Sequence, residues 1–560
     1  MSLDRARVGR ALATLGWGGG ALLSSRFDPA TVLVPGLAAL RGPLGVVLGV
    51  LAVSVALAQL GAPWVGPAGG GALPRRVPAP SWIFAIAASL FVAAGLYYTT
   101  RLRVSGDEPH YLLMAQSLWR EGDLDLRDNL QREDFREYTP GPVAPHFAAP
   151  RADGRPFPAH AAGLPALLAP VYAAGGRPAV VIVLALAAAG LATLVHAHAR
   201  RTTPGPGAGT AAWTAAVGPP LLFYAFHVYT EVPSAVALTG ALLLIDRARS
   251  AAGGSLAGAG AGLLAGALPW LHVKMAPACL ALAVVGGVRL RGRALAAFAA
   301  GAGGLLAGLA GFHHSVFGSP SPLSVYGGFP GDASGDPARA AAGLLLDRSF
   351  GLLPHAPVFL LALPGVVQLV RRRLGSAGPL LAVGVAVLAP VLVWRMWWGG
   401  QCPPGRFLVP LVPLLAVAVG ACVERGGGLA RWRWPLLGLG FGLGVFMVAR
   451  PGELLLLNRG DRPTRVWAAL EGEAGVARYL PSLVSPDPAE ARVAAVWAIA
   501  IAVLLVLDAA ARRRHAVDRL FRGLGLPLAI LLAASVAVDR WARAGPPPPP
   551  SAVTETAPPP

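Results

Sequence analysis

The stretch PAVVIVLALAAAGLATLV, residues 178–195, decides the fold of this 560-residue chain. It contains no charged residue, so as a helix it can cover most of the roughly 30 Å of hydrocarbon in a bilayer. Two arginines, Arg200 and Arg201, follow it closely. The stretch therefore predicts a membrane-spanning helix that leads into a positively charged loop.

The rest of the chain repeats this pattern. Hydrophobic residues make up 55% of the sequence and charged residues only 13%, which is more apolar surface than a soluble core needs. We predict an all-α, polytopic membrane helix bundle of about 13–14 transmembrane helices. The spans are expected near residues 44–62, 82–99, 178–195, 209–227, 231–246, 254–271, 275–288, 294–312, 351–370, 379–397, 406–423, 435–450, 493–510 and 524–540.

The arginines predict how the bundle is oriented. The net charge of +19 comes from short arginine clusters in every second loop, which is typical of the cytoplasmic side of a membrane protein rather than of nucleic-acid binding. The protein is therefore expected in the cell inner (plasma) membrane, with no nucleic-acid partner. The alternate loops carry most of the acidic residues and are predicted to be extracytoplasmic: 100–177, 313–350, 398–405 and 451–492.

The ends of the chain and its longest loop divide it further. No cleavable signal is evident, so the first apolar spans should remain as anchors. Within the first outer loop, Tyr111 to Leu118 predicts an amphipathic helix near the interface, and residues 161–174 predict a surface-lying helix that is too short to span. The expected regions are an N-terminal part with an extra membrane segment (1–80), a membrane core (81–450), an outer loop (451–492), C-terminal membrane helices (493–543) and a proline-rich tail (544–560).

An acidic pair lies in the stretch SGDEPHYLLMAQSLWREGDLDL, Ser105 to Leu126. Asp107 and Glu108 can simply open a helix, because acids favour a helix N-terminus and Pro109 suits the first helical position. Alternatively, one carboxylate is held near low-dielectric protein and has a raised proton affinity. It could then act as general base on an acceptor hydroxyl or amine.

Two basic residues stand out against the arginine clusters. Lys274, in PWLHVKMAP, is the only lysine among 47 basic side chains and lies at the outer end of a span. A compact ammonium retained there favours a phosphate partner, with chance retention or snorkelling as the alternative. Arg406 begins a span from the outer face, where a guanidinium can clamp phosphate oxygens or anchor the helix at the interface.

Other polar residues give weaker signals. Glu231, in YTEVP, is explained by helix capping through Thr230. The three cysteines, Cys279, Cys402 and Cys422, form neither a disulfide framework nor a metal quartet. We expect no protein-bound metal and no cofactor, since no metal-site spacing connects the histidines His110, His146, His160, His272, His313, His314 and His355. Nucleotide hydrolysis has no support, because a phosphate-binding glycine loop is missing from the sequence.

The stretch SGDEPHYLLMAQSLWREGDL resembles the first-loop signature of GT-C membrane glycosyltransferases, in particular the protein O-mannosyltransferase and aminoarabinose transferase (family 39-like) group, which uses polyprenyl-phosphate sugars. Further resemblances follow in the same order, over about 82 to 423: HAAGLP at 160–165, TEVPSA at 230–235, HVKMAP at 272–277 and WWGGQCPPGRFLVPLVP at 397–413. Ala159, His160 and Ala161 depart from the acidic and basic pair of aminoarabinose transferases, which leaves the sugar and the acceptor open.

The resemblance implies an integral membrane glycosyltransferase, a hexosyl- or pentosyltransferase. It would move a sugar with inversion from a polyprenyl-phosphate donor, a membrane lipid, to an envelope glycan, lipid or protein acceptor. It also implies site residues: Asp107 as base with Glu108 beside it, Lys274 and Arg406 on the donor phosphate, and His160 and Glu231 shaping the cavity.

Two other classes are weighed against this one. A flippase or transporter of polyprenyl-linked glycans would predict charges near the bilayer midplane and a two-fold repeat, and neither is evident. A structural subunit of an envelope assembly would leave the outer acidic pair unexplained.

Overall fold

The fold is described from a computed structural model and is helical, as predicted. In the described residues the only β-type pairing is an isolated bridge between Phe147 and Pro158. The structure describes residues 5–26, 28–34, 37, 38, 41, 49, 52, 80–101 and 103–543, apart from 105, 140, 145, 149–150, 152, 155–156, 204, 206, 251–253, 327–333, 373–376, 456–464, 472–474, 485–486 and 512–524. The predicted span at 44–62 and the tail at 544–560 therefore lie outside the described residues, apart from residues 49 and 52.

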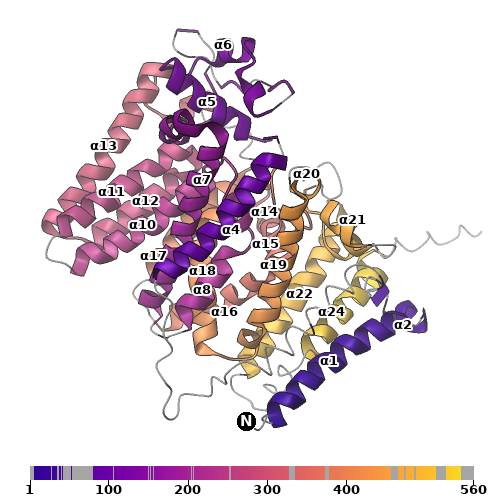
Figure 1. Cartoon of the computed structure of the whole chain (residues 1–560). Helices are drawn as coiled ribbons and strands as arrows, with labels where there is room; N and C mark the ends of the chain where they lie inside the picture. The colour runs from indigo at the N-terminus through magenta and orange to yellow at the C-terminus, as the bar shows by residue number, and fades with distance from the viewer. Residues whose placement is uncertain are drawn as a thin grey trace, which may run out of the picture.

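The helices form one bundle, with α5 and α6 at one end and α22 and α24 on the flank away from α10 to α13 (Figure 1). The helices are α1 (Arg5–Ser25), α2 (Asp28–Leu33), α4 (Pro80–Arg101), α5 (Glu108–Arg120), α6 (Leu126–Gln131), α7 (Gly163–Thr202), α8 (Ala208–Val217), α9 (Leu221–Tyr224), α10 (Glu231–Ser250), α11 (Gly254–Leu271), α12 (Ala276–Arg289), α13 (Gly292–Phe317), α14 (Pro337–Leu346), α15 (Leu352–His355), α16 (Ala362–Arg371), α17 (Ala377–Val393), α18 (Val412–Arg425), α19 (Arg433–Ala449), α20 (Pro451–Leu454), α21 (Arg465–Glu471), α22 (Pro488–Ala511) and α24 (Gly525–Ala537). Two 3-10 turns matter for the site, η3 (Val273–Met275) and η6 (Arg406–Leu411).

Seven helical segments of the described residues are long and apolar enough to cross a membrane. They are Pro80–Arg101, Gly163–Thr202, Gly254–Leu271, Gly292–Tyr326, Arg406–Arg425, Leu429–Ala449 and Pro488–Ala511. Each matches a span predicted from the sequence to within one residue at its end or contains it, so the multi-pass character of the chain is confirmed. Other predicted spans form shorter or more charged helices, such as α17 and α10.

Two predicted spans are wrong as continuous helices. The span at 209–227 stops at Val217 and resumes as the short α9, because Gly218, Pro219 and Pro220 interrupt it. The span at 351–370 is likewise divided into α15, a 3-10 turn and α16. Proline lacks a backbone N–H donor and so interrupts a helix. Apolar composition does not register this effect, and for that reason both segments were predicted as continuous spans.

The first outer loop is more deeply built into the molecule than its sequence suggested. The helix predicted over Tyr111 to Leu118 exists as α5, but it is buried along most of its length and packs against α7, not along an exposed interface. The predicted helix at 161–174 is the first part of α7. The backbone leaves helical geometry at Gly175 and Gly176 before α7 continues.

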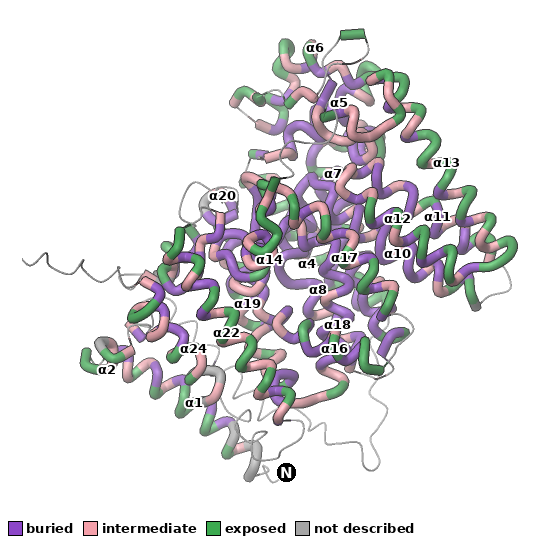
Figure 2. Tube along the Cα trace, turned by 180° about the vertical axis from the view of Figure 1, so that it is seen from behind, coloured by how far each residue is buried: buried purple, intermediate pink, exposed green. Residues whose placement is uncertain are grey.

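Small residues bring the helices of one flank together. Gly258, Gly262 and Gly266 recur at every fourth position of α11 and lie against the backbone of α13. A methyl group at any of the three would meet that backbone. Close contact through small residues is the usual means of helix association in a membrane. Towards the centre, α18 is mostly buried, whereas α13 is largely exposed (Figure 2).

The four loops predicted to face outward lie together in the structure. Three contacts connect them in series: Gly106 lies against the Gln401 carbonyl oxygen, the Gly405 N–H donates to the Phe350 carbonyl oxygen (3.0 Å), and the Arg348 N–H donates to the Pro481 carbonyl oxygen (2.8 Å). Loops that share one side of a membrane must be able to meet. These contacts therefore support the alternation derived from the arginines.

The arginine-bearing loops meet at the other ends of the same helices. The Gly207 N–H donates to the Glu424 carboxylate (3.1 Å), and Arg289 pairs with Asp246 (2.7 Å). Asp246 lies 15 residues after Glu231, the first residue of α10, and Glu424 lies 18 residues after Arg406, the first residue of its candidate span. Helical segments of these lengths extend about 23–27 Å, which covers most of the hydrocarbon core of a bilayer.

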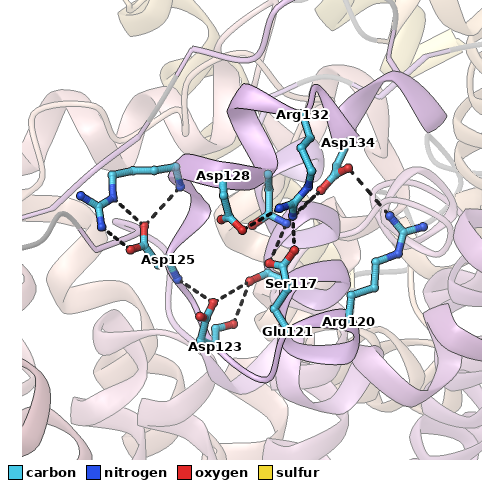
Figure 3. Close-up of polar contacts among 10 residues, drawn as sticks. Ser117, Arg120, Glu121, Asp123, Asp125, Asp128, Arg132 and Asp134 are labelled. Atoms are coloured by element: carbon cyan, nitrogen blue, oxygen red, sulfur yellow. Dashed lines mark hydrogen bonds and ion pairs between the residues drawn. The ribbon is translucent and has the colours of Figure 1, made fainter.

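A local ionic network stabilises the region beyond α5 (Figure 3). Arg132 is its centre and forms ion pairs with Asp128 (2.8 Å), Asp134 (3.1 Å) and Glu121. Asp125 caps the N-terminus of α6 by accepting a hydrogen bond from the Arg127 N–H. These residues lie within a short segment of the chain, and the arginines are about half exposed.

Candidate active site

Four charged residues from four distant segments meet where the outer loops join. Asp107 precedes α5, Glu231 begins α10, Lys274 lies in η3 and Arg406 begins η6. Arg406 donates to Asp107 through Nη2 (2.5 Å) and to Glu231 Oε1 through Nε (3.0 Å). Lys274 Nζ donates to the same Glu231 oxygen (2.9 Å). We call these four residues the charge cluster.

Asp107 and Glu108 have different surroundings although they are adjacent in sequence. The Asp107 side chain makes no capping hydrogen bond to α5 and lies against Arg406 instead. The Glu108 carboxylate is fully buried and accepts hydrogen bonds from the Tyr98 hydroxyl (2.6 Å) and the Val228 N–H (2.9 Å). Side-chain capping is therefore excluded for Asp107, and Glu108 joins α4 to the segment before α10.

The prediction that the acidic residue has a raised proton affinity is wrong for Asp107 in this state of the site. Burial by itself would raise the pKa of the Asp107 carboxyl. The guanidinium of Arg406 outweighs burial and, helped by His160 and His110, holds that pKa well below its usual range. Asp107 is consequently an ionised carboxylate at neutral pH, but a weak base while Arg406 contacts it.

Glu231 holds the two cations in place. Its side chain has no exposed surface, and its Oε1 accepts from both Lys274 and Arg406. The Thr230 hydroxyl makes no hydrogen bond in the described structure, so side-chain capping by Thr230 is not the explanation for this motif. The other oxygen of Glu231, Oε2, is buried and has no hydrogen-bond partner among the described residues. A buried carboxylate oxygen without a donor is uncommon and suits contact with a bound ligand.

Aromatic rings also contact the two cations. The Arg406 guanidinium lies 4.3 Å from the centre of the Tyr229 ring, and Lys274 Nζ lies 4.1 Å from the centre of the Phe407 ring. Burial keeps the pKa of Lys274 below its ordinary value although Glu231 opposes this effect. A second anion beside Lys274 would favour its charged form.

Two glycines allow the backbone to approach this cluster. Gly106 has a φ of +62°, and a side chain there would collide with the Tyr229 hydroxyl and the Gln401 carbonyl oxygen. Gly399 has a φ of +90°, lies against the Arg406 side chain, and its carbonyl oxygen accepts from Arg406 Nη1 (2.8 Å). Glycine is required where a positive φ coincides with such close contact.

His160 lies at the edge of the charge cluster rather than within it. Its ring is 5.0 Å from that of Tyr111, and burial together with the positive charge nearby lowers its pKa. It lines a pocket with Trp270, His272, Phe312 and Tyr326. The pocket adjoins the cluster, because His272 Nδ1 accepts a hydrogen bond from the Lys274 backbone N–H (3.2 Å).

The structure therefore brings together most of the residues predicted from the sequence. Asp107, Glu231, Lys274 and Arg406 are in contact, His160 is adjacent, and Glu108 faces elsewhere. Sequence reasoning missed Tyr229 and Phe407, although each lies within two residues of a residue that it did select. Their position beside a charge in an outer turn was the available signal.

Comparison with known proteins yields distant structural similarities. The sequence matches no protein family and no curated protein sequence. The structure is similar to ArnT from Cupriavidus metallidurans bound to undecaprenyl phosphate, with a TM-score of 0.45 and 14% identity over 82% of this chain and 78% of that chain. It is also similar to the oligosaccharyltransferase AglB from Archaeoglobus fulgidus in complex with an inhibitory peptide and a dolichol-phosphate (TM-score 0.41, 13% identity, 72% of this chain and 55% of that chain).

Both structures are GT-C fold glycosyltransferases, the class that the sequence resembles.

Proposed function

We propose that this protein is a membrane glycosyltransferase that moves a sugar from a polyprenyl-phosphate donor to an acceptor hydroxyl or amine at the extracytoplasmic face. One observation carries the proposal: two carboxylates and two cations from four segments converge at the predicted outer ends of the helices. This transfer needs a general base and a cationic phosphate-binding site at the membrane surface, provided that water is excluded.

The donor phosphate would bind between Lys274 and Arg406. A lysine ammonium has three N–H donors, and the bond from Lys274 to Glu231 uses one of them. A guanidinium has five, and Arg406 uses three of them for Asp107, Glu231 and the Gly399 carbonyl oxygen. Further donors are therefore available to phosphate oxygens. Glu231 keeps both cations aligned, and its Oε2 could accept a hydrogen bond from a sugar hydroxyl.

Donor binding would also activate the base. A phosphate that attracts the Arg406 guanidinium competes with Asp107 for the same donors, so the effect that lowers the pKa of Asp107 is weakened. Burial then favours a higher pKa. Asp107 has 24% of its side chain exposed, against 7% for Arg406, and is the more accessible member of the pair.

The reaction then needs one concerted displacement. The proton of the acceptor O–H or N–H passes to the Asp107 carboxylate while the acceptor atom bonds to the anomeric carbon of the sugar. The bond from that carbon to the phosphate oxygen breaks, and its electron pair leaves with the polyprenyl phosphate. Lys274 and Arg406 stabilise this negative charge. Attack from the face opposite the phosphate inverts the configuration.

The position of the cluster favours this function over transport. A transporter of polyprenyl-linked glycans would place its charges midway along the spans. Glu231 is instead the first residue of α10, and Arg406 is the first residue of a candidate span.

The test is a transfer assay with the purified full-length chain. The protein is incubated with a panel of radiolabelled polyprenyl-phosphate sugars and membrane acceptors, and labelled products are identified. We expect transfer from at least one donor, with release of polyprenyl phosphate, and its loss in Asp107→Asn. Translocation of the lipid across vesicles without sugar transfer would favour a transporter and overturn the proposal.

The side of the membrane is tested separately. Single cysteines replace Ser334, in a loop predicted to face outward, or Arg293, in the first turn of α13 at the arginine-bearing end, in a chain without the native cysteines. Both positions are exposed in the structure. In intact cells an impermeant thiol reagent should label the cysteine at 334 and not the one at 293. The reverse result would place the charge cluster on the cytoplasmic side.

A further inference from the structure

Three histidines gather beside Asp107, although the sequence separates them. His110 lies in the first turn of α5, and His146 and His160 come from the loop between α6 and α7. The bridge between Phe147 and Pro158 explains how these last two meet. Around it, the Ala159 N–H donates to the His146 carbonyl oxygen (2.8 Å), and the Ala148 N–H donates to the Phe157 carbonyl oxygen (2.8 Å).

The three rings converge closely. The His110 ring centre is 4.1 Å from that of His146 and 5.0 Å from that of His160. One ring nitrogen from each histidine lies within 4.8 Å of the other two. His146 Nδ1 and His160 Nε2 are only 3.4 Å apart.

We propose that His110, His146 and His160 bind one divalent transition-metal ion of the zinc class. Imidazole nitrogen is a preferred ligand of such ions, and three protein ligands with one open position are a common zinc arrangement. Two nitrogens that bind a tetrahedral zinc ion at 2.0–2.1 Å are about 3.4 Å apart. This is the distance between His146 Nδ1 and His160 Nε2.

The sequence predicted no metal site because the histidines were compared only by their spacing along the chain. In the folded protein, their distances in space decide. Residues 110, 146 and 160 show no ligand spacing in sequence, yet a short backbone bridge and the first turn of α5 place them together. The ion would tie the loop that precedes α7 to the helix that begins after Asp107. The proposal does not depend on the proposed transferase function, because metal binding is measured without donor or acceptor.

The experiment uses the purified full-length protein after removal of metal with a chelator. Co²⁺ serves as a spectroscopic probe for zinc, and bound metal is also counted by elemental analysis. We expect about one ion per chain, with visible absorption typical of a four-coordinate site and a rise in the thermal unfolding midpoint. An absence of stoichiometric binding would mean a stack of imidazoles without an ion and would overturn the proposal.

Matched variants identify the ligands. His146 is exposed, so His146→Ala should fold, and we expect its affinity for Co²⁺ to fall at least about 10- to 100-fold. His314→Ala is the control, because His314 is an exposed histidine of α13 outside the trio, and it should bind as the unsubstituted protein does. Equal binding by both variants would overturn the assignment.

A replacement ligand distinguishes coordination from a structural effect. His146→Cys keeps a metal-binding atom at this position but changes nitrogen to sulfur. We expect this variant to bind Co²⁺ and to add a sulfur-to-metal charge-transfer band. Binding without such a band would show that residue 146 does not contact the metal and would exclude it as a ligand.

Discussion

Two clusters of carboxylates and cations among the described residues differ in how they are built. In the network around Arg132, the partners are separated by few residues and the arginine is about half exposed. In the charge cluster, Arg406 pairs with Asp107 and Glu231, which are 299 and 175 residues away, and is almost completely buried. Exposed pairs contribute little because water screens them, whereas buried charges need partners to be tolerated at all. The network around Arg132 stabilises the local fold, whereas the charge cluster is the site of the proposed transfer.

The largest expected effect is that of Asp107→Asn. Asparagine keeps the size of the side chain but cannot accept the proton, so turnover should fall by about 10²-fold or more. The transfer assay measures this, and the thermal unfolding midpoint shows whether the variant folds. Near-normal turnover would remove Asp107 as the base and make the two clusters equivalent.

The next effect is that of Lys274→Ala, for which kcat/KM for the donor should fall about 10- to 100-fold, because one phosphate contact is lost. Arg406 would still pair with Glu231 in this variant. Lys274→Arg should recover only part of the activity, since a planar guanidinium does not replace a compact ammonium. Full activity of Lys274→Arg would indicate an ordinary cation at the membrane interface.

The pH dependence of activity should show whether donor binding separates Asp107 from Arg406. A general base is inactive when protonated, so activity falls as the pH drops through its pKa. The profile of kcat/KM reflects the free enzyme, where Arg406 lowers the pKa of Asp107, and the profile of kcat reflects the donor complex. The acid limb of kcat should therefore lie at higher pH, by about one unit or more. Coincident limbs would mean that donor binding leaves the pair intact.

A smaller effect is expected for Glu108→Gln. Glutamine keeps one acceptor oxygen, for the Tyr98 hydroxyl or the Val228 N–H, but it loses the charge and replaces the other oxygen by an amide nitrogen that cannot accept. Turnover should fall less than tenfold, roughly in line with a weakened buried hydrogen bond. A loss equal to that of Asp107→Asn would show that the two acids act as one unit.

The smallest effect should come from the local network. Arg132→Ala removes three ion pairs, none of which includes a residue of the charge cluster. Turnover should therefore stay within about twofold of that of the unsubstituted protein. The transfer assay and the unfolding midpoint provide the measurement. A large loss of activity would contradict the separation of the two clusters drawn above.

The sequence by itself determined the helical membrane class, and it predicted the alternation of loops and most of the site candidates. Apolar runs such as residues 178–195 predict helices because any segment in hydrocarbon must satisfy its backbone internally. Lys274 and Arg406 could be selected because a cation at the outer end of a span is unusual for this chain. These signals depend only on residues that are neighbours along the chain, so they can be recognised in the sequence alone.

Only the tertiary structure decided which of the local signals belong together. It paired Arg406 with Asp107 and so lowered a pKa that burial alone would raise. It turned Glu108 away from its neighbour and brought three separated histidines within reach of one ion. Distances between segments depend on how helices pack, and helix ends a hundred residues apart in sequence leave no periodic trace of their contact. For that physical reason, residue types were predictable from the chain, whereas their protonation and partners were not.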